Sequence, residues 1–154
     1  MHLIVSSVVE NLMKTTLLAV FALAGAAVAQ TAQPPAAAKH KVVFQMNVAD
    51  TDSWNQLLGN IGNARTAFQR DGVEIEVVFY GKGLSALLKT NAAYEERLKK
   101  AAADGVVLAA CQNSMRLRKV TSQDIFPFST EVDSGVAELI RKQEAGFSYI
   151  RAGE

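Results

Sequence analysis

Hydrophobic and polar residues follow two different periods between residues 41 and 150. Continuous apolar runs, rich in β-branched residues, predict five strands. These strands cover residues 42–48, 73–80, 106–110, 129–132 and 147–150. Between them, apolar residues recur at spacings of three and four, which predicts helices. The predicted helices begin at residues 52 or 53, 84, 90 or 91, 113 or 114, and 134.

This alternation of strands and helices predicts an α/β fold with a mostly parallel sheet covered on both faces. Five strands joined by right-handed crossovers fit a flavodoxin-like, three-layer fold with strand order 2-1-3-4-5. In that order the first and third strands are neighbours where the winding direction reverses, and ligands bind beyond their carboxyl ends. We expect the loops 49–52, 80–83 and 111–113 to meet there.

The N-terminal segment reads as an export signal. Met13-Lys14 precedes an apolar run that ends in Ala27-Val28-Ala29, so residues 1–29 are predicted to be a signal peptide cut after Ala29. The pattern is cleaner from Met13, which is an alternative start. Residues 30–40 form a Pro/Ala-rich linker, and residues 41–154 form the folded domain. We expect a periplasmic protein; the alternative, an uncleaved anchor, would need a longer apolar run of about 20 residues.

Charge and composition exclude several classes of function. The chain has 16 Lys and Arg, 15 Asp and Glu and a net charge of +1, so no charge excess drives binding to nucleic acid or to an anionic membrane. The mature form is expected to have no membrane partner. The histidines are His2 and His40, and the one cysteine is Cys111. This set cannot make a typical zinc site, and we expect no metal and no cofactor.

Cys111 is the candidate catalytic residue. It follows the apolar run 105–110 and precedes the polar run Gln112-Asn113-Ser114. That pattern predicts a thiol at the carboxyl end of a buried strand and at the start of a helix, where the helix dipole lowers the thiol pKa and the sulfur is exposed. The alternative is that Cys111 is a small buried apolar residue without chemistry.

Three residues that follow the cysteine in the sequence are candidates for stabilising its thiolate. The side chains of Asn113 and Ser114, together with the amides of the helix start, could stabilise the negative sulfur. Arg118 could add a positive charge, although a solvent-facing helix surface explains the basic residues that follow Cys111 equally well.

Two other loops supply further candidates. Gly81 and Gly83 flank Lys82 and could form an anion-binding nest, with a plain turn as the alternative. Asp50 could act as an acid, a base or a cation ligand, or be simply solvated while Asp52 caps the following helix.

Three segments of the chain, 77–84, 105–114 and 134–150, together resemble the DsrE/DsrF-like family of small sulfur-relay proteins. The resemblance implies a flavodoxin-like fold and homo-oligomers, often trimers or hexamers. In sulfurtransferase members, a cysteine after a central strand carries persulfide sulfur between donor and acceptor proteins. Cys111 matches that position.

Two hypotheses from different classes follow. The first is a periplasmic persulfide carrier, or sulfurtransferase-like protein, that uses Cys111. The alternative is a non-enzymatic oligomeric module that binds a small ligand or a protein in the same crevice. An FMN-dependent role is disfavoured, because the loop after the first strand lacks the Ser, Thr and Gly residues that cradle a phosphate.

Overall fold

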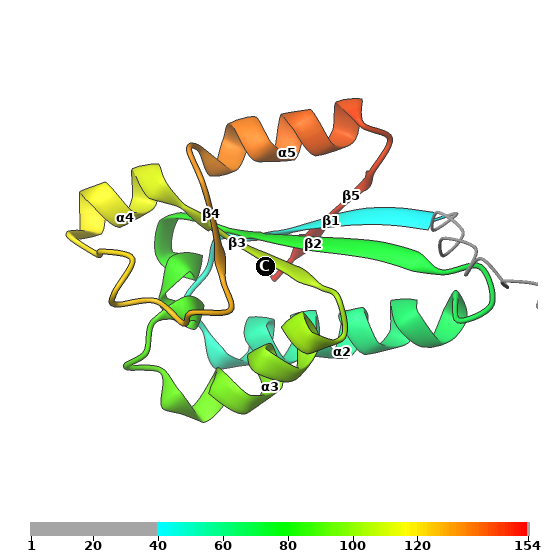
Figure 1. Cartoon of the computed structure of the whole chain (residues 1–154), viewed down its shortest axis with the longest axis horizontal. Coiled ribbons are helices and arrows are strands. Elements are labelled where there is room, and N and C mark those ends of the chain that lie inside the picture. The colour runs from blue at the N-terminus through cyan, green and yellow to red at the C-terminus, as the bar shows by residue number, and fades with distance from the viewer. Residues whose placement is uncertain (1–39, 154) are drawn as a thin grey trace, which may run out of the picture. The chain divides into compact units, whose positions relative to one another are not determined.

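The computed structural model describes residues 40–153, which form a five-stranded parallel sheet with helices on both faces (Figure 1). The elements are β1 (His40–Met46), α2 (Thr51–Ala67), β2 (Val73–Phe79), the 3₁₀ helix η1 (Gly81–Leu87), α3 (Ala92–Ala103), β3 (Val107–Cys111), α4 (Gln112–Arg118), β4 (Thr130–Val132), α5 (Gly135–Glu144) and β5 (Ser148–Ala152). The predicted α/β class is confirmed. His40 begins β1 instead of ending the linker, and the predicted signal peptide lies outside the described residues.

The strand order is β4-β3-β2-β1-β5, and all neighbours are parallel. The predicted order 2-1-3-4-5 is wrong in detail, because β2 lies between β1 and β3. The chain winds in one direction from β1 to β4, and only the connection through α5 returns to the far side of β1. The predicted and the observed strand orders use the same succession of strands and helices along the sequence, so hydrophobic periodicity cannot distinguish between them.

The larger core lies between the sheet and the face covered by α2 and α3 (Figure 1). Alternate strand residues point into it, as the side-chain period of two requires. Those exposed by 1% or less include Phe44, Met46, Val77, Phe79 and Leu108. The loop before β4 inserts Phe126, which is 1% exposed and stacks on Phe128 with ring centroids 5.1 Å apart.

The smaller core lies on the opposite face, where α5 packs (Figure 1). Its buried members are Val43, Val78, Ala109, Leu139 and Phe147. Leu139 comes from the middle of α5, and the three strand residues come from β1, β2 and β3, with Val78 and Ala109 paired directly across β2 and β3. One helix therefore fixes its position against three strands through a few side chains.

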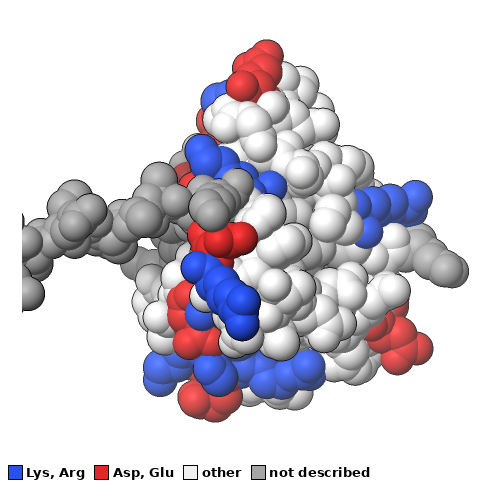
Figure 2. Space-filling view, turned by 90° about the vertical axis from the view of Figure 1, so that its right-hand side faces the viewer, with Lys and Arg blue, Asp and Glu red and all other residues white. Residues whose placement is uncertain are grey.

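The surface is mixed in charge. On the face drawn in Figure 2, basic and acidic side chains lie beside one another, with uncharged areas between them. Within residues 40–153, no helix is both long and apolar enough to cross a membrane.

Candidate functional site

Cys111 ends β3 and is the N-cap residue of α4, as the sequence predicted. It lies on the α5 face of the sheet, two residues after Ala109 of the smaller core. The prediction of an exposed sulfur is wrong for the single protomer, because Cys111 is only 3% exposed. The start of α5 lies against the sulfur: the Gly135 amide donates a hydrogen bond to Cys111 Sγ at 3.1 Å.

The sulfur is buried among hydrogen-bond donors and not among aliphatic groups alone. Besides the Gly135 amide, the Ser114 hydroxyl and the amides of Ser114 and Asn113 interact favourably with the thiolate. The donors come from the first turns of α4 and α5. The two helix starts thus converge on one atom, which is the arrangement that stabilises an anion.

These contacts set the pKa of the thiol. Burial raises the pKa of Cys111, but the hydrogen bonds from Ser114, Gly135 and Asn113 outweigh burial, so the pKa lies below that of an ordinary cysteine. A lower thiol pKa increases the fraction of nucleophilic thiolate near neutral pH.

Ser114 joins two of the predicted loops. Its side chain is buried, and its Oγ accepts a hydrogen bond from the Gly81 amide at 2.8 Å. Gly81 has a φ of +52°, in the left-handed region that favours glycine. The structure therefore brings together three of the predicted site residues: Cys111, Ser114 and Gly81.

Both glycine amides of the predicted anion-binding nest are already hydrogen-bonded. The Gly81 amide already donates to Ser114, and the Gly83 amide donates to the Tyr80 carbonyl at 3.0 Å. Gly83 instead permits close packing, since a Cβ there would lie 2.7 Å from the carbonyl carbon of Met46. The absence of a side chain at Gly83 thus lets η1 pack directly against the end of β1.

Three other predicted residues have different roles in the structure. The Asn113 side chain is exposed and accepts a hydrogen bond from Arg116, so only its amide serves the sulfur. Arg118 is exposed in the last turn of α4, at the opposite end from Cys111. Asp50, and not Asp52, caps α2, because its carboxylate accepts a hydrogen bond from the Ser53 amide at 2.8 Å. That hydrogen bond lowers the pKa of Asp50.

Gly135 and Tyr80 are site residues that the sequence did not single out. Tyr80 follows Phe79, which is paired with Ala110, so Tyr80 lies beside Cys111 on the α5 face. A Cβ at Gly135 would lie 2.8 Å from the Tyr80 Cβ, so only glycine lets α5 begin this close to the sulfur. The signal in the sequence is a glycine directly after the helix cap Ser134, but its partner depends on the strand order.

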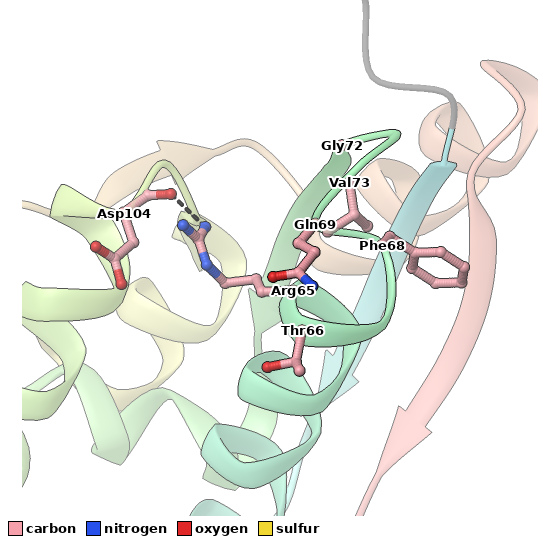
Figure 3. A pocket seen from close by; sticks show the side chains of 7 residues that line it. All are labelled: Arg65, Thr66, Phe68, Gln69, Gly72, Val73 and Asp104. Atoms are coloured by element: carbon pink, nitrogen blue, oxygen red, sulfur yellow. Dashed lines mark hydrogen bonds between the residues drawn. The ribbon is translucent and has the colours of Figure 1, made fainter.

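A cavity at the surface lies away from the thiol. It has a volume of about 500 Å³ and is lined by Arg65, Thr66, Phe68, Gln69, Gly72, Val73 and Asp104 (Figure 3). Val73 begins β2, which places this cavity at the amino edge of the sheet, whereas Cys111 ends β3 at the carboxyl edge. The Arg65 guanidinium that faces it already donates to the Asp104 carbonyl (Figure 3). Among residues 40–153, no three His, Cys, Asp or Glu side chains are grouped to hold a metal ion.

Comparisons with known proteins identify a family and a similar solved structure. The DsrE/DsrF-like family model matches residues 19–152. Protein MTH1491 of Methanobacterium thermoautotrophicum, a protein of unknown function, has a similar structure with a TM-score of 0.63 and 30% sequence identity. The match covers 73% of this chain and 98% of that chain. No curated protein matches the chain.

Proposed function

Because this chain belongs to the DsrE/DsrF-like family and is in general terms a sulfur-relay-type protein, we propose that it carries sulfane sulfur as a persulfide on Cys111. The observation that supports this proposal is the environment of the sulfur. Four donors from two helix starts surround a thiol whose pKa they lower despite burial. A cysteine that served only as packing would not need these donors.

The reaction that we propose needs no oxidant. The Cys111 thiolate attacks the outer sulfur of a donor persulfide, R–S–SH. A new S–S bond forms to Cys111, the donor S–S bond breaks, and R–S⁻ leaves with the bonding electron pair. The terminal sulfur keeps its proton, so Cys111 ends as Cys–S–SH. Transfer to an acceptor thiolate repeats the step and returns Cys111 as a thiolate.

The hydrogen-bond donors serve both directions of this exchange. When sulfur arrives, the amides of Gly135 and Ser114 hold the attacking thiolate in its ionised form. When sulfur departs, the same donors stabilise Cys111 as the leaving thiolate, and a leaving group of lower pKa departs faster. The site therefore suits a carrier, which must load and unload the same atom.

The setting of this activity is also part of the proposal. The family resemblance supports a homo-oligomer, a trimer or hexamer, that exchanges sulfur with a donor or acceptor protein. The pattern Ala27-Val28-Ala29 after an apolar run supports export to the periplasm.

The proposal is tested by loading the purified mature protein with glutathione persulfide. We expect intact-mass spectrometry to show the addition of one sulfur atom, and peptide mapping to locate it on Cys111. The Cys111→Ser protein should take up no sulfur, since Cys111 is the chain's one cysteine. The loaded protein should return its sulfur to a free thiol such as glutathione.

A folded protein that takes up no sulfur at Cys111 would contradict the proposal. Circular dichroism of the same samples serves as the control for folding. Loading that is as slow as with an unfolded cysteine peptide would also count against it, because the structural donors would then give no advantage.

A non-enzymatic binding module is the second candidate. The observation that favours it is the 3% exposure of Cys111, which leaves little of the residue open to a donor. This candidate predicts that Cys111→Ser keeps full binding of the ligand or protein partner. The persulfide carrier predicts that the substitution abolishes sulfur transfer while the fold remains intact.

A further inference from the structure

A series of linked ion pairs runs beneath and along α5. Glu76 of β2 is 3% exposed, and its Oε2 lies 2.6 Å from Lys142 Nζ. Lys142 lies 3.9 Å from Glu138, which in turn pairs with Arg141 at 2.8 Å. The last charged residue of this series is Asp133, which lies in the loop that precedes α5 and pairs with Arg141 of the helix.

The buried carboxylate of Glu76 is costly to the fold. Its Oε1 is buried and has no hydrogen-bond partner among residues 40–153. Desolvation raises the pKa of Glu76, although the hydrogen bond and charge of Lys142 oppose this. A buried ion pair of this kind is often replaceable by apolar residues without loss of stability, so stability alone does not account for it.

The geometry connects this pair to the thiol. Residues 76, 78 and 80 of the β2 segment share the α5 face, because side chains alternate along a strand. On α5, Lys142 pairs with Glu76, Leu139 packs in the core with Val78, and Gly135 adjoins Tyr80 and Cys111. One end of the helix is thus fixed by the ion pair, and the other end delivers the amide to the sulfur.

We propose that Glu76 and Lys142 are positioning residues for the thiol: their ion pair fixes the register of α5 on the sheet and so holds the Gly135 amide on Cys111 Sγ. This inference rests on the proposed function of Cys111 as a sulfur carrier. Neither residue touches the sulfur, and both act through the placement of α5. The pair Asp133–Arg141 extends the same control to the loop that leads into the helix.

Positioning can be separated from a direct effect of charge by the sign of the response. If Glu76 acted on the sulfur only through its negative field, Glu76→Gln would favour the thiolate. If Glu76 acts by holding α5, the same substitution weakens the hydrogen bond from Gly135 and disfavours the thiolate. Lys142→Met disfavours the thiolate in both cases, so Glu76→Gln decides between the two.

The experiment is a pH titration of the Cys111 thiolate by its ultraviolet absorbance in the full mature protein, with Cys111→Ser subtracted at each pH. We expect Glu76→Gln to lower the ratio of thiolate to thiol at fixed pH by about fivefold, which corresponds to losing about one hydrogen bond. Lys142→Met should lower it similarly. The matched control is Lys100→Met, which breaks the exposed pair Lys100–Asp104 on α3 (2.8 Å) and should leave the ratio unchanged.

The double variant Glu76→Leu/Lys142→Leu is the control for unfolding of the single variants, because it removes both charges and leaves neither one buried alone. We expect it to fold and still to show the reduced thiolate ratio. An unchanged or increased thiolate ratio in folded Glu76→Gln, or an unchanged ratio in the folded double variant, would overturn the inference. The titration needs no sulfur transfer, so failure of wild-type protein to load persulfide would overturn the proposed function separately.

Discussion

Replacing Gly83 by alanine is expected to lower the free energy of unfolding by about 3 kcal/mol. The new Cβ would overlap the Met46 carbonyl oxygen and lie 2.7 Å from its carbon and 2.9 Å from the Asn47 nitrogen. These are backbone atoms at the end of the buried strand β1, and they cannot move aside as a flexible side chain would. Relief requires η1 to separate from β1, which opens the larger core beside Leu84.

Urea unfolding followed by circular dichroism measures this effect, with Gly59→Ala as the matched control. Gly59 lies in α2 with no atom within 4 Å of its expected Cβ, so the control should raise the free energy of unfolding by roughly 0.5–1 kcal/mol. Equal effects of the two substitutions would show that the contact between η1 and β1 is not tight.

Replacing Ser114 by alanine is expected to decrease the thiolate-to-thiol ratio of Cys111 by about tenfold at a given pH, the value of one charge-assisted hydrogen bond. The Ser114 hydroxyl is the foremost of the contacts that lower the pKa of Cys111 against the effect of burial. The substitution also leaves the buried amide of Gly81 without its acceptor. Sulfur loading at neutral pH should slow accordingly.

The same substitution changes how stability depends on pH. Cys111 has a lower pKa in the folded protein than in the unfolded chain, where it is about 8.5. Its ionised form therefore stabilises the fold; this contribution is complete above the unfolded pKa and is lost as pH falls through the folded pKa. Compared with Cys111→Ser, the wild type should gain stability as pH rises toward about 8.5, and Ser114→Ala should reduce that gain.

Thiolate absorbance and urea unfolding across this pH range measure both effects. Ser85→Ala is the matched control, because it removes a hydroxyl that bonds the Lys82 carbonyl within η1 and does not contact the sulfur. A thiolate ratio in Ser114→Ala equal to that of the control would refute the role assigned to the Ser114 hydroxyl.

The succession of strands and helices could be predicted from the sequence, because each element carries its own hydrophobic period. Strands β1 to β3 contain continuous apolar runs, which indicate burial on both faces. The pattern does not say which strand lies beside which. The return of the chain through α5 to the far side of β1 depends on packing between Leu139 and three strands, and those contacts connect distant parts of the sequence.

The candidate site could be predicted only as far as local patterns extend. Cys111 at the junction of a strand and a helix follows from the adjoining residues. The Gly135 amide reaches the sulfur from another element, and Tyr80 lies against Gly135, so both contacts depend on the strand order. Glu76 alternates with apolar residues at the start of β2, a pattern typical of a solvent-facing position, yet α5 buries it.

The pairing of β5 with β1 determines when this fold can be completed. Residues 42–46 of β1 are paired with residues 148–152 of β5, so β1, an internal strand of the sheet, lacks one of its two neighbours until the last strand has been synthesised. A nascent chain on the ribosome can form the first βαβ units but cannot complete the sheet. Pairing of such distant segments is slow, so the completed chain stays open for a time after release.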